Sequence, residues 1–149
     1  CFGVALCGEN SEEYNYRILK FADELSEKLG FGYLIRFHPS NRKGKYYAVA
    51  SNFYRGVDDY YARCEFTLLG LSGVYIDFLD AGHPFAFYDD GTLPEVFFMS
   101  GCVVRDFDEC EAFVDELDGF DFKAVAKTFN DCGRQVEVLR GALCDRVVV

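Results

Sequence analysis

The sequence predicts an α/β fold: a Rossmann-like, three-layer αβα domain with a mostly parallel sheet. Short apolar runs alternate along the chain with amphipathic segments, and this alternation is typical of βαβ units. Strands in such units are covered on both faces, which suits apolar runs that are hydrophobic throughout. At 149 residues, half of them hydrophobic, the chain is long enough to bury one sizeable core.

The first predicted unit is a strand followed by a long helix. Residues 2–7 form a short apolar run that ends at Gly8, as expected of a buried strand. Asn10 followed by Glu13 is the pattern of a capping box, and apolar residues then recur at helical spacing until Gly30. We therefore expect a helix that begins beside Asn10 and ends at Gly30.

A second strand and a polar loop follow. Residues 31–37 predict a strand that ends at His38-Pro39, because proline cannot continue a central strand. The loop over residues 40–45 is polar and basic. Residues 46–50 predict a short strand, and residues 58–63 predict a helix of one or two turns.

The next stretch predicts a strand, a tight turn, a helix and another strand. The apolar run 64–69 stops at residues 70–73, Gly-Leu-Ser-Gly, and a short amphipathic helix then runs to Gly82. Residues 84–88 form the following strand. Small residues suit any turn from a strand to a helix, but they also let an anion approach the backbone.

The last third of the chain predicts one more strand and two helices. Residues 102–107 form the strand, and Asp108 with Glu111 is a second capping pattern. Asp121 begins a final long helix. The apolar faces of the two helices are formed by Cys110, Phe113, Val114 and Leu117, and by Phe122, Val125, Ala126, Phe129, Val136 and Leu139.

Composition excludes several classes of function. The formal charge of −10 and the isoelectric point near 4.6 disfavour general binding to the phosphates of DNA or RNA. No apolar run reaches the roughly 18 residues of a membrane span, and no signal-peptide pattern is present, so we expect a soluble, cytoplasmic protein. Seven scattered cysteines without a C-x-x-C pair are typical of reduced, buried thiols and indicate neither a disulfide framework nor a metal site.

Two predicted strand ends carry candidate phosphate ligands, because ligands of parallel sheets bind beyond the carboxyl ends of the strands. The hydroxyl and backbone N–H groups of Ser72-Gly73 suit an anion, although Ser72 would equally serve as a plain helix N-cap. His38 suits a hydrogen bond to a diphosphate or proton transfer, and the alternative is a structural loop histidine. His83 lies at the opposite edge of the sheet and is interpreted as structural.

Charged residues extend the candidate site. Asp77 lies five residues after Ser72 and either accepts hydrogen bonds from a ribose or faces solvent. Asp89-Asp90-Gly91 is interpreted as a turn rather than as a metal site. No G-x-G-x-x-G or P-loop motif is present, which disfavours a dinucleotide-type dehydrogenase or a P-loop ATPase. A basic loop either attracts a phosphate-bearing ligand or is merely solvated; its residues are Arg36, Arg42, Lys43 and Lys45.

Three motifs follow one another in a recognisable order. Residues 34–40, Leu-Ile-Arg-Phe-His-Pro-Ser, end a strand in His-Pro; residues 72–78 form a turn and helix that begin with serine; and residues 83–88 form a His-Pro-strand element. Together they resemble the C-terminal, nucleotide-binding half of GT-B-fold transferases, in particular bacterial CDP-glycerol glycerophosphotransferases and related capsule and polysialic-acid glycosyltransferases. The resemblance covers residues 2–117, with Gly73 in place of the family's second serine.

This resemblance implies a donor-binding site. It implies that His38 contacts the donor diphosphate as the catalytic group, that Gly8, Ser72 and Gly73 bind phosphate, and that Asp77 lies near the ribose. The donor would be a nucleotide diphosphate of the CDP or UDP type, with no separate cofactor and no metal. The general base would lie on a missing N-terminal acceptor domain.

We therefore expect residues 1–149 to be a single nucleotide-donor-binding domain. Because the sequence starts at Cys1 and its only methionine is Met99, we expect a fragment of a two-domain protein that acts in cell-surface polysaccharide synthesis. Peripheral attachment to the inner face of the membrane would come from absent residues or from the basic loop. Two alternatives stay open: a nucleotide-sugar 2-epimerase domain, and a non-catalytic, flavodoxin-like domain that binds a partner.

Overall fold

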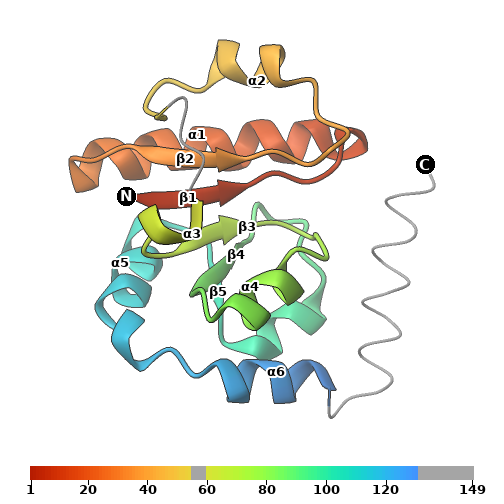
Figure 1. The fold of residues 1–149 in the computed structure, drawn as a ribbon, viewed down its shortest axis with the longest axis vertical. Coiled ribbons are helices and arrows are strands. Elements are labelled where there is room, and N and C mark those ends of the chain that lie inside the picture. The colour runs from red at the N-terminus through yellow and green to blue at the C-terminus, as the bar shows by residue number, and fades with distance from the viewer. Residues whose placement is uncertain (55–59, 131–149) are drawn as a thin grey trace.

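Five parallel strands form the centre of the structure, a computed structural model that describes residues 1–54 and 60–130 (Figure 1). The strands pair in the order β2-β1-β3-β4-β5, and each neighbouring pair is parallel. Their bounds are β1 Phe2–Ala5, β2 Tyr33–Arg36, β3 Thr67–Leu69, β4 Phe85–Tyr88 and β5 Val103–Val104. The predicted α/β fold with a parallel sheet is confirmed.

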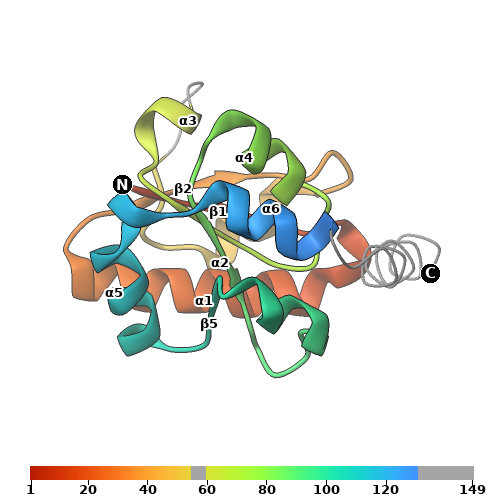
Figure 2. The same ribbon diagram turned by 90° about the horizontal axis from the view of Figure 1, so that it is seen from below.

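Helices cover both faces of this sheet (Figure 2). Within the described residues they are α1 Glu12–Leu29, α2 Lys43–Val49, α3 Tyr60–Arg63, α4 Tyr75–Ala81, α5 Phe107–Asp115 and α6 Phe122–Asn130. Three short 3-10 turns accompany them: η1 Glu9–Ser11, η2 Glu95–Ser100 and η3 Leu117–Gly119. Helices α1 and α5 lie on one face, and α3 and α4 lie on the other (Figure 2).

The sheet separates two hydrophobic cores, because alternate residues of a strand point to opposite faces. Val4 and Leu68 belong to the cluster that includes the apolar face of α1. Leu69 and Phe87 belong to the second cluster, which includes Phe78 of α4. The result is the three-layer arrangement that the alternation of strands and helices predicts.

The order of the strands reverses between β1 and β3, because the chain places β2 on one side of β1 and β3 on the other. Outside β2, Phe53 makes one further parallel bridge to Tyr33. The Tyr33 N–H donates to the Asn52 carbonyl at 3.2 Å, and the Tyr54 N–H donates to the Tyr33 carbonyl at 2.8 Å. The five strands follow the order 2-1-3-4-5, the flavodoxin-like order of doubly wound sheets, whose switch point lies between β1 and β3.

Helix α1 ends as predicted but begins differently. Gly30 adopts the left-handed conformation, with φ of 77°, and its N–H donates to the Ser26 carbonyl. At the other end the N-cap is Ser11, which makes no side-chain capping hydrogen bond, and Asn10 lies in η1. The predicted capping box at Asn10 and Glu13 is therefore wrong, because a 3-10 turn leads the chain into the helix.

The prediction of a strand over residues 46–50 is also wrong, because helix α2 occupies this part of the chain. Tyr46 is fully buried in the core that includes α1. Tyr47 stacks on Phe53, with 5.1 Å between ring centroids. A run this short does not distinguish a helix from a strand by its pattern, and burial of Tyr46 decides between them.

Helix α5 begins earlier than predicted. Asp106, not Asp108, is its N-cap, and the Asp106 side chain accepts a hydrogen bond from the Glu109 N–H at 2.9 Å. Glu109 in turn accepts a hydrogen bond from the Arg105 N–H at 2.8 Å. Strand β5 is correspondingly confined to two residues, because the turn into the helix starts where the prediction continued the strand.

Helix α6 begins after Asp121 as predicted, and the Asp121 side chain accepts a hydrogen bond from the Ala124 N–H at 2.9 Å. The predicted continuation through Val136 and Leu139, and the predicted start of α3 at Asp58-Asp59, lie outside the described residues. None of the helices in the described ranges combines the length and apolarity that crossing a membrane requires. No disulfide joins the cysteines of these ranges, and four of them are buried: Cys7, Cys64, Cys102 and Cys110.

Candidate functional site

A cavity of about 420 Å³ opens beyond the carboxyl ends of β1 and β2, beside the turn that follows β3. Ala5 and Leu6 form its floor, residues 36–39 form one wall, and residues 72–74 with Asp77 form the other. Strand order reverses at this place, and doubly wound sheets bind ligands in the crevice at such a switch point. The cavity is therefore where the fold would hold a ligand.

Four of the five residues predicted to bind a donor line this cavity: His38, Ser72, Gly73 and Asp77. Arg36 of the predicted basic loop lines it as well. Gly8 is not among the lining residues, but a methyl group added at Gly8 would lie 3.6 Å from the His38 ring. Arg42, Lys43 and Lys45 do not line the cavity either. Three chain segments that are distant in sequence thus contribute side chains to one site.

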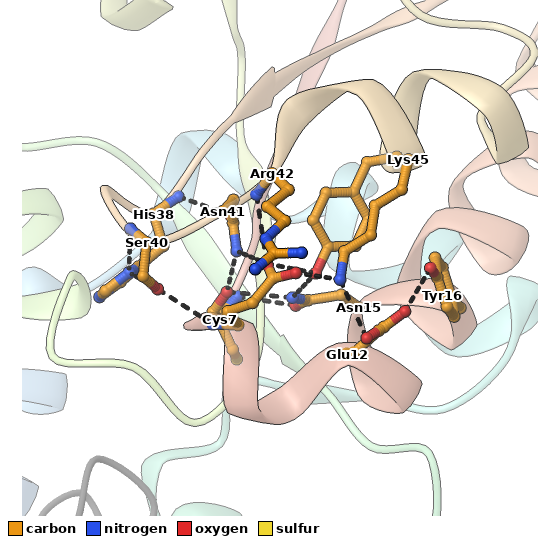
Figure 3. Close-up of polar contacts among 11 residues, drawn as sticks. Cys7, Glu12, Asn15, Tyr16, His38, Ser40, Asn41, Arg42 and Lys45 are labelled. Atoms are coloured by element: carbon orange, nitrogen blue, oxygen red, sulfur yellow. Dashed lines mark hydrogen bonds and ion pairs between the residues drawn. The ribbon is translucent and has the colours of Figure 1, made fainter.

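His38 lines the cavity, and hydrogen bonds to neighbouring loop residues hold it there (Figure 3). Its Nδ1 accepts a hydrogen bond from the Ser40 backbone N–H at 3.1 Å and lies 2.8 Å from the Ser40 hydroxyl. A backbone N–H can only donate, so the neutral ring carries its proton on Nε2. Within the described ranges, no hydrogen bond involves Nε2, and this N–H is available to a ligand.

Arg36 and Asp77 form an ion pair on opposite walls of the cavity, with 3.1 Å between Nη2 and Oδ2. The other terminal nitrogen of Arg36 donates to the Tyr61 hydroxyl at 2.8 Å. The guanidinium also lies over the Phe78 ring, 5.4 Å from its centroid. The Asp77 side chain is 58% exposed, so the pair contributes little to stability; it fixes the Arg36 guanidinium at the cavity wall.

The turn Gly70-Leu71-Ser72-Gly73 contains two glycines whose surroundings differ. A methyl group at Gly70 would lie 2.2 Å from the Tyr14 ring and 2.8 Å from the Cys7 sulfur, so packing requires glycine there. A methyl group at Gly73 would meet nothing within 4 Å. Packing therefore explains the first glycine, and the second leaves the backbone open toward the cavity.

Ser72 is not the N-cap of α4. The helix begins at Tyr75 with Val74 at the N-cap position, and no side chain caps it. The Ser72 Oγ accepts a weak hydrogen bond from the Val74 N–H at 3.4 Å. Ser72 therefore does not serve as the helix N-cap that the sequence allowed. Among the described residues its hydroxyl acts only as an acceptor, so its hydrogen could be donated to a ligand.

The predicted basic loop is dispersed. Lys45 pairs with Glu9 and, at 2.9 Å, with Glu12 on the α1 side (Figure 3). The Lys45 hydrogen bond holds the pKa of Glu9 below its ordinary value, and the two carboxylates raise the pKa of Lys45. Lys43 lies over the Phe37 ring, 5.3 Å from its centroid. Of the four basic residues, only Arg36 lines the cavity, and there it is paired with Asp77.

Sequence reasoning missed the polar residues that hold the loops in place. Asn15 is fully buried; its Oδ1 accepts from the Cys7 N–H at 2.8 Å, and its Nδ2 donates to the Cys7 carbonyl at 3.0 Å. Asn41 accepts from the His38 N–H at 2.8 Å and donates to the Cys7 carbonyl at 2.9 Å. The signal for Asn15 is present in the sequence, because it is a polar residue on the apolar face of a helix.

The two remaining candidates are structural. His83 is buried, and its Nε2 lies 2.7 Å from the Thr67 hydroxyl. Asp89 accepts hydrogen bonds from the N–H groups of Gly91 and Leu93, so the predicted turn is confirmed. Across the described residues, no group of three or more His, Cys, Asp or Glu side chains is arranged to hold a metal ion.

The chain matches no model of a known protein family, no curated protein and no solved structure. The cavity combines an imidazole N–H, a guanidinium and a serine hydroxyl beside an open glycine backbone, from His38, Arg36 and Ser72-Gly73. These groups are hydrogen-bond donors, and donors converging on one cavity suit a phosphate or diphosphate. Asp77 lines the same cavity and offsets the charge of Arg36, so the guanidinium serves there as a donor rather than as an unpaired charge.

Proposed function

We propose that this cavity binds the diphosphate of a nucleotide-activated donor, and that the domain is the donor half of a GT-B-type transferase. Such an enzyme would move a sugar or a polyol phosphate to a cell-surface polymer. The observation that supports the proposal is the convergence of His38, Arg36 and Ser72-Gly73 on one cavity at the switch point of the sheet.

The chemistry of these groups suits a departing diphosphate. When the bond to the transferred group breaks, negative charge develops on the phosphate oxygens, and preorganised donors stabilise that charge. His38 would donate from Nε2, and Arg36 would add guanidinium N–H donors, which its contacts with Tyr61 and Asp77 hold in place. Catalysis of this kind consists mainly of positioning and charge stabilisation.

Asp77 suits the ribose of the same ligand. Its Oδ2 accepts from Arg36, whereas its Oδ1 has no hydrogen-bond partner in the part of the chain that the structure describes. A carboxylate oxygen accepts hydrogen bonds readily, so Oδ1 would accept from a ribose hydroxyl. One residue would then orient both the cation and the sugar of the nucleotide.

Activation of the acceptor would fall to a general base on another domain. The neutral His38 ring presents an N–H at Nε2, and a general base must instead present an acceptor to the proton that it removes. We therefore expect the 149-residue chain to bind the donor without turning it over. The base would come from the acceptor domain of the complete enzyme.

Binding measurements test the proposal. Calorimetry and thermal unfolding with CDP, UDP, CMP, GDP and NAD should identify one nucleotide that stabilises the chain. Ligand at 100 times its Kd adds about 2.7 kcal/mol, which raises Tm by about 5–10 °C for a domain of this size. His38→Ala, Ser72→Ala and Arg36→Ala should each weaken binding.

Arg63→Ala is the matched control, because Arg63 is an exposed arginine of α3 that does not line the cavity. It should bind the nucleotide like the wild type. A folded wild-type chain that shows no response to any nucleotide at millimolar concentration would refute the proposal and favour a domain that binds a protein partner. Conversion of the sugar of a bound donor to its epimer, by the complete enzyme without acceptor, would favour the 2-epimerase.

A further inference from the structure

We propose that Ser40 is a positioning residue that holds His38 in the tautomer with its proton on Nε2, so that His38 donates a hydrogen bond to an anionic oxygen in the cavity. The proposed function supplies the identity of that oxygen, a phosphate oxygen of the donor. The assignment of the tautomer is independent of the ligand, because it depends only on contacts between Ser40, His38 and Glu9.

The hydrogen bonds around Ser40 have defined directions. The Glu9 backbone N–H donates to the Ser40 Oγ at 3.0 Å. Since Oγ already accepts there, its single hydrogen is available for the His38 Nδ1 at 2.8 Å. The Ser40 backbone N–H donates to the same nitrogen at 3.1 Å. One residue thus directs two donors at Nδ1, which favours an unprotonated Nδ1 and a protonated Nε2.

The loop that carries Ser40 is anchored to the neighbouring strand end. Asn41 accepts a hydrogen bond from the His38 backbone N–H at 2.8 Å and donates to the Cys7 carbonyl at 2.9 Å. Ser40 itself contacts the loop after β1 through Glu9. The backbone of His38 and the Nδ1 edge of its ring are both fixed, as Figure 3 shows, and the ring presents Nε2 without rearrangement.

This arrangement defines what His38 does. A ring with a hydrogen on Nε2 donates to an oxygen that carries negative charge, and it cannot take a proton from an acceptor hydroxyl through that nitrogen. His38 then acts on the leaving diphosphate rather than on the nucleophile. Glutamine offers an N–H donor but no ring that exchanges protons, so His38→Gln should retain a function that His38→Ala loses.

Nitrogen-15 NMR of the imidazole rings at alkaline pH tests the tautomer directly. The chain has two histidines, and the signals lost in His38→Gln assign His38. We expect Nε2 to be protonated in the wild type and in Ser40→Thr, which keeps the hydroxyl at an exposed position. Ser40→Ala should raise the share of the Nδ1-protonated form about fivefold, the ratio that one net hydrogen bond supplies.

Two spectra would overturn the proposal: a protonated Nδ1 in the wild type, or the same tautomer share in Ser40→Ala as in the wild type. Ser51→Ala is the control, because Ser51 is exposed and its contacts with Asp23 come from its backbone N–H. It should leave the imidazole signals unchanged. These readouts need no ligand, so they decide the role of Ser40 even if no nucleotide binds and the proposed function fails.

A double-mutant cycle tests whether Ser40 acts on binding through His38. With the nucleotide that binds best, or with inorganic pyrophosphate, Ser40→Ala should lower affinity about fivefold and Ser40→Thr should restore it. In the His38→Ala background, Ser40→Ala should have no further effect. An equal loss in both backgrounds, or a His38→Gln variant as weak as His38→Ala, would show that His38 is not the donor through which Ser40 acts.

Discussion

Replacing the buried Asn15 with leucine should destabilise the domain strongly, although the two side chains have similar size. Asn15 lies on α1 with none of its surface exposed. Its amide forms three hydrogen bonds, with the Cys7 N–H at 2.8 Å, the Cys7 carbonyl at 3.0 Å and the Tyr46 hydroxyl at 3.1 Å. Leucine can make none of them and places apolar atoms against these polar groups.

The magnitude follows from those contacts. Each hydrogen bond contributes about 1 kcal/mol to stability, so Asn15→Leu should lower the free energy of unfolding by about 3 kcal/mol. For a chain of this size, this corresponds to a decrease in Tm of about 6–12 °C. The loop after β1 should also loosen, because Asn15 binds both backbone groups of Cys7, and nucleotide affinity should fall with it.

Urea and thermal unfolding followed by circular dichroism provide the assay, with Asn10→Ala as the control. Asn10 is exposed and does not cap α1, so its replacement should change stability by less than about 0.5 kcal/mol. An Asn15→Leu variant with a Tm within about 2 °C of the wild type would refute the reasoning. A cost of about 1 kcal/mol for Asn10→Ala would show that the capping box forms after all.

Three further predictions follow from packing and ionisation. Gly70→Ala should destabilise the fold by about 1–3 kcal/mol or more, because its methyl group would overlap the Tyr14 ring. Gly73→Ala should keep the wild-type Tm but bind nucleotide more weakly; equal Tm values for the two variants in thermal melts would contradict this. Burial opposes ionisation of Asp90, but hydrogen bonds and a paired arginine hold its pKa below the ordinary value. Asp90→Asn should therefore remove stability that is fully present at about pH 7 and that is lost as the pH falls from about 4 through the lowered pKa. A Tm difference between the variant and the wild type that does not shrink as the pH is lowered below about 4 would argue against it. Burial raises the pKa of the Cys64 and Cys110 thiols to about 12. Both should resist alkylation at about pH 8 until the chain unfolds, and peptide mapping that finds either labelled in the folded chain would contradict this.

Local sequence patterns predict those elements in which a sustained apolar periodicity and a start or stop residue indicate the same structure. Helix α1 has an apolar face sustained over 18 residues and a glycine at its end, so its existence and its stop were both predictable. Helix α2 has only seven residues, too few for a periodicity to show. The sequence places the cap of α5 at Asp108, two residues after the observed cap at Asp106. Both aspartates precede an apolar face, and only the backbone conformation decides between them.

Composition and periodicity by themselves determined the class of the fold, the position of most strands and helices, and the candidates His38 and Ser72, because these properties depend on neighbouring residues. The tertiary structure alone decided which strand ends meet. The order β2-β1-β3 places the ends of β2 and β3 on either side of β1, and so sets His38 and Arg36 opposite Ser72 and Asp77. It also decided which basic residues reach the site: Lys45 is paired with carboxylates near α1, whereas Arg36 lines the cavity, paired with Asp77. Such choices depend on distances between segments far apart in the chain, and no local pattern contains them.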